Sequence, residues 1–226
     1  MRKRTGSTSW LFTAILLIAI VGITSLAVAQ TPDGVVTTNG GLRTLFLKPP
    51  SHSALPSEPL PAGVITIYSN LGKGDQTYNP NAGVGILGPN AGQPWPQSVG
   101  CAFIPTKDHL VQAVRVGATY VQGTNGIIVS LNEDDNGIPG KALASGKFRN
   151  LPRFGSCCTL QTGKGKSGVQ IKANTQYWVV LQPIADDTYA VWDDNFNEIQ
   201  GTWSNTLGSG WNTSYQVLGA FGVYGQ

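Results

Sequence analysis

Short runs of β-forming residues, each ended by a cluster of Gly, Pro, Asn or Asp, follow one another through most of this chain. The runs occupy residues 64–68, 99–104, 110–121, 126–131, 142–148, 157–161, 169–171, 177–181, 189–192, 201–203 and 217–223. No segment keeps a helical period over ten residues or more. This pattern predicts an all-β fold, an antiparallel β-sandwich with a jelly-roll-like arrangement. Residues 177–181 are apolar on both faces, so we expect them in a central strand.

The composition changes between residues 30 and 62. This stretch holds six of the 14 prolines, among Ser, Thr and Gly. Such a composition buries too little apolar surface to offset the entropy of ordering the chain. We therefore predict a disordered Pro-rich linker over 30–62 and one β-sandwich domain over 63–226. The run 42–47 has the residues to pair with another strand, although Pro49 and Pro50 end it.

The first 29 residues have the organisation of an export signal. Arg2, Lys3 and Arg4 precede an apolar run that ends in Ala27-Val28-Ala29. A basic start, an apolar centre and small residues at the cleavage site predict a signal peptide over 1–29. An uncleaved signal anchor is the alternative, and it would be the chain's only contact with a membrane. Either way the rest of the chain is exported, so we expect a secreted or cell-surface protein.

The charge of the chain lies at this N-terminus. The whole sequence has 15 basic and 12 acidic side chains, and Arg2, Lys3 and Arg4 supply the whole excess of three. A neutral domain has no basic surface for phosphates, so we do not expect it to bind nucleic acid.

Three cysteines, Cys101, Cys157 and Cys158, stand in a chain that export would place in an oxidising compartment. Adjacent residues of a strand point to opposite faces, so only one of Cys157 and Cys158 can meet Cys101. We expect one disulfide, from Cys101 to either of them. The alternative is that all three are small buried side chains.

One segment has the oxygen-rich spacing that opens a calcium loop. Asn132, Asp134 and Asn136 alternate, and Gly137 follows at the sharp turn. The bidentate glutamate that closes such a loop is absent, because Leu143 holds that position. A polar hairpin turn explains the same residues and is the favoured interpretation. Calcium is the one cofactor that the sequence suggests.

The remaining motifs argue against a dinucleotide site and against catalysis. Residues 83–88 match the G-x-G-x-x-G pattern, but the prolines at 89, 94 and 96 forbid the helix that a dinucleotide site needs. His109 has no evident catalytic partner, and no G-x-S-x-G elbow is present. We therefore expect no enzymatic activity.

Aromatic residues in turn-rich segments are the remaining candidates for a binding site. Trp203, Trp211 and Tyr215 lie close to Gly and Asn, and exposed rings of this kind can stack on sugars. The competing interpretation is that they pack in the core or at the ends of the sandwich. For Trp178, inside the most apolar run, we expect the core.

The domain resembles the bacterial choice-of-anchor R domain over about residues 64–224. The segments that carry the likeness are 65–71, 102–105, 131–140, 150–152, 155–160, 175–178, Trp192 and 218–221. The resemblance implies a secreted or surface β-sandwich with no established activity and no catalytic residues.

We therefore expect a non-catalytic extracellular protein with a structural or adhesive role, its partner a glycan or a surface or matrix protein. A carbohydrate-binding module that stacks glycan on tryptophan is the alternative, and a polysaccharide-acting hydrolase ranks third.

Overall fold

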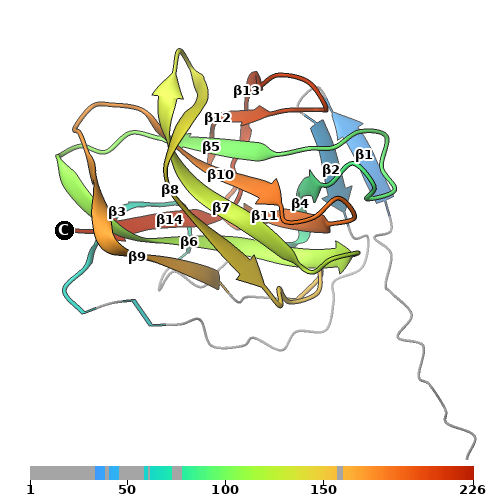
Figure 1. Ribbon diagram of the computed structural model, residues 1–226, viewed down its shortest axis with the longest axis horizontal. Coiled ribbons are helices and arrows are strands. Elements are labelled where there is room, and N and C mark those ends of the chain that lie inside the picture. Colours follow the sequence, from blue (N-terminus) through green and yellow to red (C-terminus); the bar gives the residue numbers. More distant parts are fainter. Residues whose placement is uncertain (1–33, 39–40, 46–58, 61, 73–77, 157–159) are drawn as a thin grey trace, which may run out of the picture.

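The structure is a computed structural model that describes residues 34–38, 41–45, 59–60, 62–72, 78–156 and 160–226. The described residues form strands and turns and contain no helix, and the strands make two antiparallel sheets (Figure 1). The prediction of an all-β antiparallel sandwich is confirmed. In this part of the chain no helix has the length and apolar character needed to cross a bilayer. Residues 1–29, Cys157 and Cys158 lie outside it, so the expected signal segment and disulfide stay predictions.

The six-stranded sheet carries the candidate site. Its strands follow the order β13 (Asn212–Val217), β12 (Gln200–Asn205), β5 (Val99–Phe103), β10 (Tyr177–Pro183), β7 (Gly126–Asp135) and β8 (Ile138–Arg149). As expected, the run 177–181 is central. Its β10 pairs with β5 on one side and with β7 on the other, and Tyr177 to Leu181 are all buried.

The eight-stranded sheet faces it. Its strands follow the order β1 (Gly34–Thr38), β2 (Gly41–Leu45), β4 (Tyr78–Leu87), β11 (Tyr189–Asn195), β6 (His109–Gln122), β14 (Phe221–Gly225) and β3 (Ile65–Ser69). An eighth strand, β9 (Leu160–Ile171), also pairs with β6. The long β6 therefore joins the two halves of the sheet, because β14 and β9 pair with its first part and β11 with its second.

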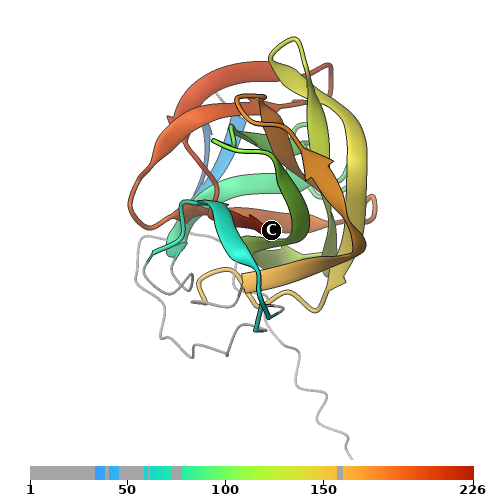
Figure 2. The same ribbon diagram turned by 90° about the vertical axis from the view of Figure 1, so that its left-hand side faces the viewer.

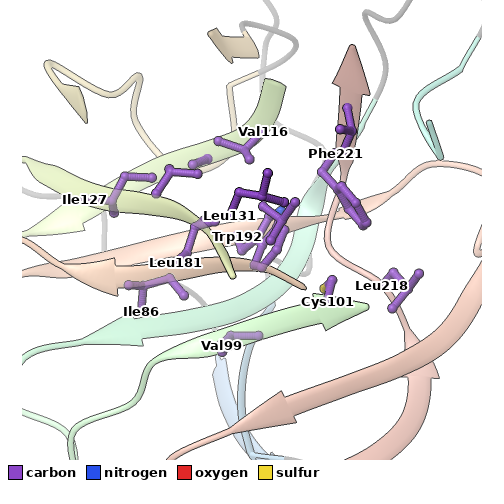
Figure 3. Packing of buried hydrophobic residues seen from close by; sticks show 14 of the residues in the cluster. Ile86, Val99, Cys101, Val116, Ile127, Leu131, Leu181, Trp192, Leu218 and Phe221 are labelled. Atoms are coloured by element: carbon purple, nitrogen blue, oxygen red, sulfur yellow. The ribbon is translucent and has the colours of Figure 1, made fainter. Parts of the chain in front are cut away.

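The turned view in Figure 2 shows the two sheets facing each other, and the close-up in Figure 3 shows buried side chains of the core that lies between them. Trp192 and Phe221 enter from the eight-stranded sheet, while Cys101 and Leu181 enter from the six-stranded sheet. The rings of Trp192 and Phe221 meet edge to face, with centroids 6.0 Å apart. Side chains that alternate along each strand thus place one apolar face inward.

Part of the expected linker is a β-hairpin. β1 and β2 pair with each other, and β2 continues onto the edge of β4 through the pair Arg43–Val84. The prediction of a linker over 30–62 is therefore wrong for residues 34–38 and 41–45. Edge pairing supplies partners for backbone groups, so a run that is weakly apolar by itself can still form a strand.

The G-x-G-x-x-G segment is also a strand, which the sequence analysis missed. Its residues 83–87 form the second half of β4, paired with β11. Gly83 lies so close to β11 that a Cβ atom there would be 2.5 Å from the carbonyl oxygen of Trp192. The glycines therefore serve close strand packing and not phosphate binding.

Candidate functional site

The outward side chains of the six-stranded sheet form two cross-strand rows, which together we name the outer face. One row contains Thr213, Ser204, Gly100, Val180 and Ser130; the other contains Tyr215, Thr202, Ala102, Trp178 and Asn132. Residues directly opposite each other in a ladder point to the same side. Trp203 and Cys101 oppose each other at the next position along their strands. Their side chains therefore point to the other side of the sheet, inward to the core.

Trp178 points outward and is nevertheless 0% exposed. Two neighbours account for this cover. Trp211, from the connection between β12 and β13, packs against the cluster of Ala102, Trp178 and Val180. Pro139 lies over Gly100, where an added Cβ would meet the proline Cγ at 2.8 Å. Gly100 therefore provides the space that lets this second, outer layer form.

The tip of the β7–β8 hairpin lies against β13. Asn136 and Gly137 have positive φ angles of 55° and 87°. Positive φ at both central residues is the signature of the tight two-residue turn that Asn-Gly favours. The hydroxyl of Thr213 donates to the carbonyl oxygen of Gly137 at 3.1 Å. This contact links the first half of the domain to its last hairpin.

Asp134 fixes the hairpin to the buried tryptophan. Its Oδ1 accepts from Trp178 Nε1 at 2.7 Å and from Gln176 Nε2 at 2.6 Å, and its Oδ2 accepts from the Gly137 amide at 3.0 Å. Burial by itself raises the pKa of Asp134. The hydrogen bonds from Trp178, Gly137 and Gln176 outweigh burial and hold that pKa below its ordinary value.

The three residues of the possible calcium loop have protein partners. Asn132 Oδ1 accepts from the Ser130 hydroxyl at 2.7 Å, and Asn132 Nδ2 donates to the Gly140 carbonyl at 2.7 Å. Asn136 donates to the Asp135 carboxylate. Together with the bonds to Asp134, this geometry favours the hairpin-turn interpretation. Among the described residues no three His, Cys, Asp or Glu side chains are grouped closely enough to hold a metal ion.

The structure separates the three aromatic residues expected to stack on sugar. Trp203 is 1% exposed in the core, so it offers no face to a ligand, and the stacking interpretation is wrong for this residue. Tyr215 is 69% exposed on β13, and Trp211 is partly buried on the outer face. Trp95, 36% exposed, lies against Gly208 in the β12–β13 connection.

Two hydroxyl-bearing residues accompany Trp211 and Tyr215, and the sequence analysis missed both. Thr202 lies directly opposite Tyr215, and Thr213 stands two positions before it on the same strand face. Period-two alternation in 200–205 and 212–217 would have placed them on one face, but only the strand register shows that the two strands pair. We name Trp211, Tyr215, Thr202 and Thr213 the Trp211–Tyr215 surface.

Titratable groups elsewhere in the described chain do not converge on this surface. His109 Nδ1 lies 3.3 Å from the backbone carbonyl oxygen of Gln226. Asp193 is fully buried in β11, where Thr119 donates to its Oδ1 at 3.1 Å. Burial, opposed by the Thr119 hydrogen bond and aided by the neighbouring Asp194, raises the pKa of Asp193 well above its ordinary value.

Comparison of this chain with protein-family models, with curated proteins and with solved structures finds no match.

Proposed function

We propose that this protein is a non-catalytic extracellular β-sandwich with an adhesive role, and that it attaches to glycan through the Trp211–Tyr215 surface. The observation that carries the proposal is the position of these two rings. They lie at the β13 end of the six-stranded sheet, one half-buried and one 69% exposed, and Thr202 and Thr213 lie on the same face.

The chemistry of the surface suits a sugar. The faces of indole and phenol rings are apolar and pack against the C–H faces of a pyranose, while their polar ends stay in water. The Thr202 hydroxyl can donate and accept hydrogen bonds with sugar hydroxyls, and the Thr213 hydroxyl, which already donates to the Gly137 carbonyl oxygen, can accept one. No ionised group belongs to the surface, so we expect binding that depends little on salt.

Preorganisation supports the proposal. The Trp211 ring rests on Ala102, Trp178 and Val180, and Trp178 is itself held by Asp134. A ring fixed in this way loses little side-chain entropy when a ligand binds. The packing of Trp211 on the outer face thus supports binding as well as stability, because it holds the proposed binding residue in one orientation.

Two features of the sequence support the extracellular part of the proposal. The basic and apolar N-terminal segment ending in Ala27-Val28-Ala29 is typical of exported chains. The resemblance to choice-of-anchor R domains points to the same compartment and to the absence of catalysis.

A glycan array tests the proposal. The purified protein should bind a restricted set of glycans, and Trp211→Ala and Tyr215→Ala should each weaken the signal by about tenfold or more. Phe196→Ala is the control, because Phe196 is 64% exposed, lies in the connection before β12 and does not belong to the Trp211–Tyr215 surface. Thermal melting of each variant verifies the fold. Equal signals from all four proteins would refute the site, and hydrolysis of a bound glycan would refute the non-catalytic role.

A further inference from the structure

β13 ends the six-stranded sheet, and no described strand pairs with its outer edge. We propose that two copies of this chain associate through that edge, β13 against β13 in antiparallel orientation, and so form a two-fold symmetric dimer. This inference is independent of the proposed glycan binding.

The backbone groups available at this edge follow from the ladder. Leu218 N donates to Ile199 O at 3.0 Å, and these residues continue the register in which Gln200 opposes Val217. Hydrogen-bonded and non-hydrogen-bonded pairs alternate along an antiparallel ladder. Gln216, Ser214 and Asn212 therefore turn their backbone groups to β12. Thr213, Tyr215 and Val217 turn theirs to the open edge.

Three outward residues at this spacing are self-complementary. In a two-fold antiparallel pair centred on Tyr215, Tyr215 faces its own copy and Thr213 faces Val217 of the other chain. Each of these pairs exchanges two N–H···O bonds. The two tyrosine rings then lie side by side on the same sheet face, where cross-strand aromatic pairs are favourable.

Charge distinguishes this edge from the opposite edge of the same sheet. The end strand β8 contains Lys141, Lys147 and Arg149, which would repel a second copy. Positive side chains are a common protection against edge pairing. β13, with the sequence NTSYQV, contains neither a charged residue nor proline. Of the two edges, only β13 lacks this protection, which is why a second copy is the occupant that we propose.

The dimer would extend the sheet through both copies and bring two Trp211–Tyr215 surfaces onto one continuous face. Six residues of edge make a small contact, so we expect weak association that depends on protein concentration.

Sedimentation equilibrium without any glycan tests the dimer. The wild-type mass should rise from one chain toward two as the concentration approaches about 1 mM, the range of weak complexes. Tyr215→Lys and Tyr215→Glu should each dimerise at least tenfold more weakly, because like charges then oppose each other across the two-fold axis. An equimolar mixture of the two variants should regain dimers.

Ala142→Lys, an exposed change in β8, is the control and should dimerise like the wild type. Melting curves check that each variant is folded. A wild type that remains a single chain throughout, a Tyr215→Lys variant that dimerises as well as the wild type, or a mixture that stays monomeric would overturn the proposal. A dimer without glycan binding would leave it standing.

Discussion

A single carboxylate, that of Asp134, joins the segments that cover Trp178. It accepts hydrogen bonds from that indole, from Gln176 and from the backbone amide of Gly137. Its neighbour Asp135 is exposed, and the Asp135 carboxylate accepts a hydrogen bond from the Asn136 side chain. Two adjacent aspartates of one hairpin thus have different roles, because alternation along β7 turns only one of them toward the sheet.

Removal of this carboxylate should loosen the hairpin. We expect Asp134→Ala to lower the free energy of unfolding by about 1.5–3 kcal/mol, the range for hydrogen bonds to a charged group. Asp135→Ala, the matched control, should change it by about 0.5 kcal/mol or less. Urea denaturation measures both. The pKa of Asp134 is lowered in the fold, so its contribution is present above the unfolded-state pKa and is lost as the pH falls through the folded-state pKa. Similar losses in both variants would contradict the assigned role.

Asp193 should give the opposite pH dependence. Its pKa is raised by burial, and Oδ2 has no hydrogen-bond partner in the described part of the chain. Above about pH 4 the unfolded chain ionises this group while the folded chain keeps it neutral. Stability therefore falls as the pH rises from the unfolded-state pKa toward the folded-state pKa.

Asp193→Asn, neutral at every pH, should remove this slope and be more stable than the wild type at pH 8. Urea denaturation at several pH values between 4 and 8 measures the slope. The control is Asp187→Asn, since Asp187 is exposed and its pKa is lowered, chiefly by a hydrogen bond from Thr124. A wild-type slope that survives in Asp193→Asn would show that another group causes it.

Local chemistry made some residues of the site predictable. The hairpin turn at Asn136-Gly137 and the burial of Trp178 follow from turn preferences and from a run that is apolar on both faces. The inward position of Trp203 did not follow, because a run of three residues does not show which face of a strand meets the core. The bond from Trp178 to Asp134 joins residues 44 positions apart, and only the register of β7 against β10 brings them together.

Among the elements, β4 shows why spacing and composition mislead. The spacing of its glycines matches a nucleotide-binding motif, and its Asn and Pro residues are typical of turns. The segment is nevertheless a strand that pairs with β11 and β2. The hairpin of β1 and β2 was missed for the same reason, since a strand added at an edge depends on its partner more than on its own composition. Most central strands were predictable, because each combines β-branched or aromatic residues with flanking turns.

Close packing of β4 against β11 can be tested at Gly83. An added Cβ would collide with the Val191 side chain and with the Trp192 carbonyl. Gly83→Ala should therefore lower the free energy of unfolding by about 2 kcal/mol or more, within the range for overpacked sites. Gly210→Ala is the control, because nothing lies within 4 Å of its added Cβ. Thermal and urea unfolding compare the two. A Gly83→Ala variant as stable as Gly210→Ala would mean that the two strands are not packed as described.

At the scale of the whole molecule, one sheet carries both interactions that we propose. The eight-stranded sheet and the core cover the inner face of the six-stranded sheet, and its outer face presents Trp211 and Tyr215. Its open edge lies along the same strand as Tyr215. Neither the proposed glycan surface nor the open edge can be predicted from the overall charge or from a short motif, because both depend on the order in which the strands pair.

The central claim is that glycan binds on the outer face and nowhere in the core. An NMR titration tests it, because each of the five tryptophans in residues 63–226 contributes one indole N–H signal. With the glycan that gives the strongest array signal, the Trp211 signal should shift. The buried Trp192 and Trp203 signals should stay in place. An array without any signal, or a titration in which Trp211 does not move while the amides around Phe196 do, would contradict the claim.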